Sequence, residues 1–196
     1  APLPELVAQS VLQTRTGQDG QWRYVASEPV REYARACRSA DAARALRRRL
    51  LDRLLHWARA LPATPPLPGV REELPNLLVA LSAARGDGDA NDALTLLLWL
   101  QSSWGEISHS GEALDALDRL LQAPALDPST AAGGHAVAAW SCFEGGRRDD
   151  AMAHARQALA YPITDEPLRA MVLSRVARVR WRIERDPAAT RALLAE

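Results

Sequence analysis

Apolar residues between Gly134 and Leu159 recur every three or four positions, which indicates two helices separated by Gly145 and Gly146. The second helix carries small or apolar residues on one face, namely Ala151, Ala155, Ala158 and Leu159. A neighbouring helix can approach such a face closely, because little side-chain volume separates the two backbones. One pair of helices cannot bury all of its own apolar surface, so the pattern predicts further copies on either side.

The spacing of alanines supports this repeat, since Ala113, Ala151 and Ala189 follow one another at equal intervals along the chain. The first two alanines are each followed by a leucine and then by a proline that ends the helix: Leu121 and Pro124, Leu159 and Pro162. The segment around Ala151 resembles the tetratricopeptide repeat, whose favoured positions are occupied here by Gly146, Ala151, Ala158, Leu159 and Pro162. We therefore expect residues 86–196 to form helix-turn-helix repeats that wind into a superhelix.

The amino-terminal segment that precedes Ser39 follows a different pattern. A short helix is expected at residues 4–9, two strands at 10–13 and 22–26 with a glycine-containing turn between them, and a helix at 29–37. The hairpin is too small to stand alone and is expected to pack on the helix that follows it. This order of elements is similar to the back half of a winged helix, so we interpret residues 1–38 as a winged-helix remnant in an otherwise all-α chain.

Residues 39–85 are expected to connect these two parts. A helix over residues 41–60 has a predicted buried stripe of Leu46, Leu50, Leu54 and Trp57. Four prolines predict an extended connection over residues 61–69, and a helix over 70–84 contains Pro75. The next helix, over residues 90–103, is apolar nearly all round and is expected at the centre of the bundle.

Three runs of residues resemble, in order, landmarks of the bacterial signal-transducing ATPases with numerous domains (STAND). They are residues 23–34 preceded by 6–12, residues 73–81 with Glu73, Asn76 and Leu77, and residues 96–105 followed by 111–121. The resemblance implies a P-loop ATPase and a DNA-binding or other effector domain upstream of Ala1. The present chain is then the carboxy-terminal sensor, whose partners are that ATPase domain and a peptide, protein or small-molecule effector.

Ser27 and Glu28 occupy the positions at which related proteins carry a His-Asp pair, whose histidine contacts the phosphate of the bound nucleotide. The resemblance therefore makes Ser27 and Glu28 candidate cofactor-binding residues. A serine hydroxyl offers one hydrogen bond but no titratable charge. We favour the alternative, in which Ser27 caps the helix that begins at Pro29 and Glu28 interacts with its positive end.

Arginines gather on the predicted helix 41–60 and form a basic face of Arg44, Arg47, Arg48, Arg49 and Arg53. Such a face can bind DNA, phosphate or an acidic surface of the ATPase. Acidic partners such as Asp52 offer the alternative of a solvated, ion-paired face, and we favour it because the formal net charge is zero. Direct nucleic-acid contact is therefore not expected, and a nucleic-acid-binding regulator that uses the hairpin and this face is the second hypothesis.

Few patterns point to catalysis or to a metal. All 24 basic residues are arginine, which excludes lysine-dependent chemistry within this chain, and the four histidines are solitary in sequence. Cys37 and Cys142 lack the spacing of metal ligands and are expected to be buried, reduced thiols. No apolar run reaches the roughly 18 residues of a membrane span, and no signal peptide precedes the first helix, so we expect no membrane contact and a cytoplasmic location.

These observations predict a non-catalytic sensor that binds its effector on the concave face of the repeats and uses no cofactor. The first helix of each pair is expected to line that face. The candidate binding residues are Trp104, His135, Arg175 and Arg178. A free-standing tetratricopeptide adaptor is a further alternative.

Overall fold

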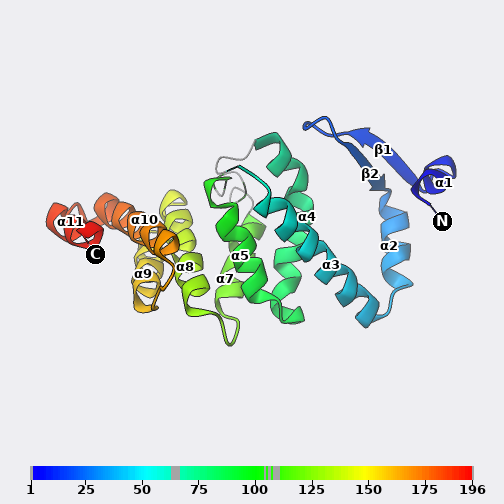
Figure 1. Cartoon of the computed structure of the whole chain (residues 1–196). Helices are drawn as coiled ribbons and strands as arrows, with labels where there is room; N and C mark the ends of the chain where they lie inside the picture. Colours follow the sequence, from blue (N-terminus) through cyan, green and yellow to red (C-terminus); the bar gives the residue numbers. More distant parts are fainter. Residues whose placement is uncertain (1, 63–66, 104, 106, 108–110, 196) are drawn as a thin grey trace.

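Helices follow one another side by side along most of the computed structural model, and a single β-hairpin lies near the amino terminus (Figure 1). The structure describes residues 2–62, 67–103, 105, 107 and 111–195. The expected mostly helical fold with one hairpin is thus confirmed. Every helix in the described part of the chain is too short or too polar to cross a lipid bilayer.

The amino-terminal part contains helix α1 (Leu3–Ala8), the antiparallel strands β1 (Leu12–Thr16) and β2 (Trp22–Ala26), and helix α2 (Glu28–Ala36). Helix α2 has no buried residue, whereas the hairpin is tied to helix α4. Arg15 pairs with Glu72 at 2.7 Å, and Arg23 pairs with Glu73. The expectation that the hairpin packs on the helix after it is wrong, because ion pairs hold it to α4.

Helix α3 (Ala40–Arg59) buries Leu51, Leu54 and Ala58 against α4 and α5. The predicted stripe is wrong in part, since Leu46 is 38% exposed and only Leu54 of that stripe is fully buried. Leu50 and Trp57 pack at the edge of the core. The buried face of α3 is rotated relative to the predicted stripe because two neighbouring helices, α4 and α5, cover it. The row of Leu51, Leu54 and Ala58 lies between these two helices.

Helix α4 spans Leu67–Asp87 and includes Pro75. It begins earlier than expected, so the predicted extended connection is wrong at residues 67–69. Residues 63–66 of that connection lie outside the described part of the chain. Helix α5 (Ala90–Trp99) is buried along Leu94, Leu96 and Leu97, as expected for a central helix, but it ends before a 3-10 turn, η1 (Gln101–Ser103).

The rest of the chain consists of helices α7 (Gly111–Leu121), α8 (Pro128–Glu144), α9 (Arg148–Ala160), α10 (Glu166–Glu184) and α11 (Pro187–Ala195). Helices α5, α8 and α10 begin at Ala90, Pro128 and Glu166, so successive helix pairs start at equal intervals, the same interval that separates the marker alanines. Each pair packs on the next, through contacts of α5 and α7 with α8 and of α8 and α9 with α10. Ala113 and Ala151 occupy equivalent positions in α7 and α9 and are both fully buried.

Helix α8 is the most enclosed of these helices, and its glycines explain why. A Cβ atom on Gly133 would lie 2.7 Å from Leu98 Cδ2, and one on Gly134 would lie 2.8 Å from Leu121 Cδ2. The hinge between α8 and α9 falls at Gly145 and Gly146 as expected, and Gly146 has a φ of 75°. The small stripe of α9 is buried at Ala151, Ala155 and Ala158, but Leu159 is 37% exposed because it lies at the edge of that stripe.

Candidate functional site

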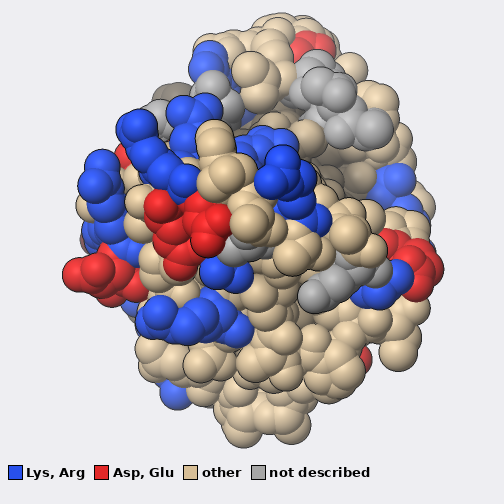
Figure 2. All heavy atoms as spheres, turned by 90° about the vertical axis from the view of Figure 1, so that its left-hand side faces the viewer, with Lys and Arg blue, Asp and Glu red and all other residues tan. Residues whose placement is uncertain are grey.

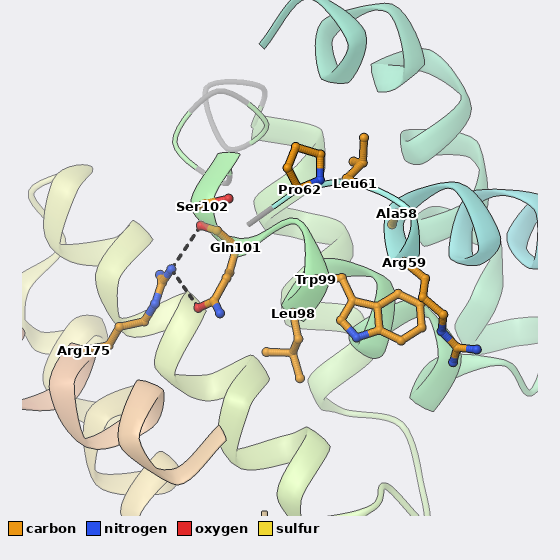
Figure 3. Close-up of a pocket in the computed structure, with 9 residues that line it drawn as sticks. All are labelled: Ala58, Arg59, Leu61, Pro62, Leu98, Trp99, Gln101, Ser102 and Arg175. Atoms are coloured by element: carbon orange, nitrogen blue, oxygen red, sulfur yellow. Dashed lines mark hydrogen bonds between the residues drawn. The ribbon is translucent and has the colours of Figure 1, made fainter. Parts of the chain in front are cut away.

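A groove runs along the first helices of the three pairs. Its first part is a cavity of about 560 Å³ lined by Ala58, Arg59, Leu61, Pro62, Leu98, Trp99, Gln101, Ser102 and Arg175 (Figure 3). Its second part is a cavity of about 460 Å³ lined by Gln101, Ser102, Gly105, Trp140, Glu144, Met171, Ser174, Arg175 and Arg178. The two cavities share Gln101, Ser102 and Arg175, so they adjoin, and each is of the size that small ligands or peptide side chains occupy.

Arg175 separates the two parts of the groove. Its side chain extends from α10 toward η1, where Nη2 donates to the backbone oxygen of Gln101 at 3.0 Å and to Gln101 Oε1 at 3.3 Å (Figure 3). Both acceptors are neutral, and among the described residues no carboxylate forms an ion pair with this guanidinium, although Glu144 lies near enough to act on it electrostatically. Burial and the nearby charge of Arg178 lower the pKa of Arg175, and the charge of Glu144 opposes that shift. An anion in the groove would therefore be stabilised beside Arg175.

Two tryptophans form the walls of the groove, and each lies under an arginine. The guanidinium of Arg59 lies 4.7 Å from the ring centre of Trp99, and that of Arg178 lies 5.4 Å from the ring of Trp140. These contacts hold both guanidinium groups at the groove wall, because the electron-rich face of an indole attracts a cation. The groove therefore combines apolar surface with three arginines, Arg59, Arg175 and Arg178.

The four candidate binding residues have separate outcomes. Arg175 and Arg178 line the groove, one turn apart on α10. His135 does not line it, because its side chain is 8% exposed and lies between α8 and α9. Trp104 lies outside the described residues. The tryptophans that do line the described groove are Trp99 and Trp140, which were not among the candidate binding residues.

Ser27 stands at the N-cap position of α2, but its side chain makes no capping hydrogen bond. The favoured interpretation of Ser27 as a side-chain cap is therefore wrong, and α2 begins at Glu28 rather than at Pro29. Glu28 accepts from Arg31 Nε at 2.9 Å and pairs with Arg35 at 3.3 Å. These arginines lower the pKa of Glu28, chiefly through the hydrogen bond from Arg31, so its carboxylate is already occupied within its own helix.

The basic face of α3 is largely neutralised. Arg47 forms a two-fold contact with Asp87, at 2.6 and 2.8 Å, and Arg44 lies 3.6 Å from the same carboxylate. The other pairs are Arg48 with Asp52, Asp89 and Asp92, and Arg53 with Glu73. Arg49 is exposed, and among the described residues none forms an ion pair with it. The arginines therefore mainly join α3 to α4 and α5, which leaves little basic surface for a phosphate backbone.

Asp89 stands at the N-cap position of α5, but its side chain makes no capping hydrogen bond and pairs with Arg48 at 2.8 Å. The expectation that both cysteines are buried is wrong for Cys37, which is exposed at the C-cap of α2, a helix with no buried residue, whereas Cys142 is buried and both thiols are free. Among the described residues, no group of three or more His, Cys, Asp or Glu side chains is arranged to hold a metal ion.

Comparisons with protein-family models, with curated proteins and with solved structures gave no match to this chain. The interpretation of the groove therefore depends on its own geometry and on the sequence patterns given above.

Proposed function

We propose that this chain is a non-catalytic recognition region that binds an effector in the groove between η1, α8 and α10. The observation that carries the proposal is the position of Arg175. It is a partly buried guanidinium whose hydrogen bonds, among the described residues, go to neutral oxygen atoms of Gln101, at the junction of two cavities. A partner that supplies an anion there gains a charge-assisted hydrogen bond that the free protein lacks.

The even spacing of the helix pairs supports a tetratricopeptide-like superhelix, because the groove lies on the first helix of each pair. In such stacks each pair contacts only its neighbours, so a ligand that touches three pairs at once changes how they pack. We place this region, by the resemblance described above, in the sensor part of a STAND-type regulator of transcription. Effector binding there would bias the upstream ATPase domain between a resting and an active state.

A test uses a phage library of random twelve-residue peptides, selected on the immobilised chain. We expect the selected peptides to bind Arg175→Gln and Trp140→Ala at least about ten-fold more weakly than they bind the wild type. A ten-fold loss of affinity corresponds to about 1.4 kcal/mol of binding free energy. Arg49→Gln is the matched control, because Arg49 is an exposed arginine outside the groove. Selected peptides that bind all four proteins equally would show that the groove is not the recognition site.

A further inference from the structure

Arginines form a stripe along helix α10 that continues beyond the groove. Arg175, Arg178 and Arg182 are spaced by three and four residues, and Arg185 follows three residues later at the C-cap. This spacing puts the first three on one face of the helix, with about 5–6 Å between neighbours. With a rise of about 1.5 Å per residue, the four residues cover about 15 Å.

The stripe is poorly compensated by acidic groups. The ion pairs within α10 are those of Arg169 with Glu166 and of Arg180 with Glu184. Among the described residues, none forms an ion pair with Arg178, Arg182 or Arg185, and all three side chains are exposed. Figure 2 looks onto this end of the molecule and shows basic side chains gathered around a small acidic group. All of those basic side chains are arginine, because the chain contains no lysine.

Helix stability alone does not account for this stripe. Basic residues near a helix C-terminus interact favourably with its dipole, and Arg182 and Arg185 meet that description. Arg175 and Arg178 lie nearer the middle of α10, where the effect has decayed. Burial lowers the pKa of Arg175, and the like charge of Arg178 lowers it further. A row of arginines that begins with the partly buried Arg175 and continues on exposed positions is typical of a surface that meets an anionic partner.

Resting on the proposed function, we propose that this partner is an extended acidic polypeptide segment, which lies along Arg175, Arg178, Arg182 and Arg185. Alternate residues of an extended chain point the same way and are separated by about 6.6 Å, close to the spacing of the arginines. Each carboxylate can therefore meet one guanidinium, in the planar paired geometry that these groups favour. An apolar residue next to the acidic run can enter the groove against Met171 and Trp140.

Single-stranded nucleic acid fits this surface less well. Proteins that bind it combine basic grooves with aromatic faces on which bases stack. The faces of Trp99 and Trp140 are each occupied by an arginine, at 4.7 and 5.4 Å. A base would have to displace that arginine, whereas a carboxylate would bind it in place.

The experiment measures fluorescence anisotropy with a labelled ten-residue peptide that alternates Glu and Ser, and with a counterpart in which Gln replaces Glu. We expect the Glu peptide to bind the whole chain and the Gln peptide to bind at least about ten-fold more weakly. Affinity for the Glu peptide should fall between about 50 and about 200 mM salt, because exposed charges are screened. Arg178→Gln and Arg182→Gln should each weaken binding about three- to ten-fold, and the double variant more, whereas Arg49→Gln should bind as the wild type does.

Three outcomes would overturn the inference. They are equal binding of the Glu and Gln peptides, arginine variants that bind the Glu peptide unchanged, and tighter binding of a ten-residue oligothymidylate that depends on the same arginines. Failure of the acidic segment can be told from failure of the groove, because phage-selected peptides test the groove separately. If those peptides bind through Arg175 and Trp140 while the Glu peptide does not bind, the recognition function stands and its partner is not acidic.

Discussion

The Nδ1 atoms of His135 and His154 lie 3.0 Å apart, which is hydrogen-bond distance, across the interface of α8 and α9. The ring of Tyr161 stacks on His135 at 5.9 Å between ring centres, with an angle of 16° between the planes. On the other side, Nε2 of His154 lies 3.6 Å from a carboxylate oxygen of Asp118 in α7. The pair therefore links three successive helices through polar groups inside the repeat.

Only one proton can lie between two Nδ1 atoms, so one imidazole donates and the other accepts. The carboxylate of Asp118 favours a proton on Nε2 of His154, which leaves Nδ1 of His154 as the acceptor and His135 as the donor. Burial and then the neighbouring His154 lower the pKa of His135 to about 4. Burial also lowers the pKa of His154, helped by Arg147 and opposed by Asp118 and Asp150. The folded chain therefore keeps this pair neutral.

The histidine pair predicts that stability falls as the pH is lowered from about 6.5 to about 4. In that window the unfolded chain binds protons that the folded chain excludes, so the free energy of unfolding falls as the pH is lowered. For His135, a shift from 6.5 to about 4 corresponds to a loss of roughly 3 kcal/mol once the pH is below 4. Urea unfolding measured at several pH values should show this dependence of the unfolding free energy on pH. His135→Phe keeps an aromatic ring against Tyr161 and should reduce the pH dependence.

His56 provides the control for that prediction, because it is an exposed histidine on α3. His56→Gln should leave the pH dependence between about 4 and about 6.5 as it is in the wild type. If His135→Phe and His56→Gln give the same slope, the buried pair does not cause the pH dependence.

A second prediction concerns Glu73, which is 4% exposed and joins the hairpin, α3 and α4. It pairs with Arg23 and with Arg53, the latter at 2.7 Å, and accepts from Asn76 Nδ2 at 2.7 Å. Although burial opposes ionisation, these hydrogen bonds and charges lower the pKa of Glu73. Glu73→Ala would leave the partly buried Arg23 without this partner, and we expect a loss of about 2–4 kcal/mol in unfolding free energy.

The matched control for Glu73 is its neighbour Glu72, whose partner Arg15 has a side chain that is 51% exposed. Glu72→Ala should cost much less than Glu73→Ala, because an exposed partner is rehydrated. Equal losses in the two variants, measured by urea unfolding, would contradict the assignment of Glu73 as the buried junction.

A third prediction uses the glycines to test the close approach of α8 to its neighbours. A side chain at Gly133 would meet Leu98 Cδ2 at 2.7 Å and Leu168 Cδ1 at 3.1 Å. Gly133→Leu should therefore destabilise the chain by about 2–3 kcal/mol through overpacking. Gly86, in α4, has nothing within 4 Å of its added Cβ, so Gly86→Ala should be neutral or should stabilise by about 0.5 kcal/mol. The thermal unfolding midpoint of each variant is compared with that of the wild type. An equal shift of the midpoint in Gly133→Leu and Gly86→Ala would contradict this packing.

The repeat could be predicted from sequence, whereas the side-chain pairs between helices could not. Ala113 and Ala151 mark the period because a buried small residue recurs wherever two helix backbones approach. His135 and His154 belong to different helices and are 19 residues apart, so neither local spacing nor motif connects them. The same holds for Arg47 and Asp87, which are 40 residues apart and convert an expected basic face into an ion-paired junction.

The groove was predicted in part. Arg175 and Arg178 were placed on the first helix of a pair, because helical spacing assigns residues to faces. Trp99 and Trp140 could not be assigned to the groove from sequence, since an aromatic residue at helical spacing to leucine and alanine gives the same pattern whether it is buried or lines a groove. A stacked arginine distinguishes a groove-lining tryptophan from a buried one, and it comes from a different helix than the tryptophan. Arg59 of α3 stacks on Trp99, and Arg178 of α10 stacks on Trp140.

The last prediction concerns the two thiols, which the sequence alone did not distinguish. Cys37 is exposed at the C-cap of α2, whereas Cys142 is buried in α8. Burial raises the pKa of Cys142, with smaller opposing contributions from Arg147, so its thiolate is scarce as well as inaccessible. We expect 5,5′-dithiobis(2-nitrobenzoate) to modify one thiol rapidly in the native chain and the second only after unfolding in urea. Cys37→Ser should remove the rapid phase and Cys142→Ala should leave it unchanged. A rapid phase that persists in Cys37→Ser would show that α8 opens in the native state, and would contradict the enclosed position of that helix in the repeat.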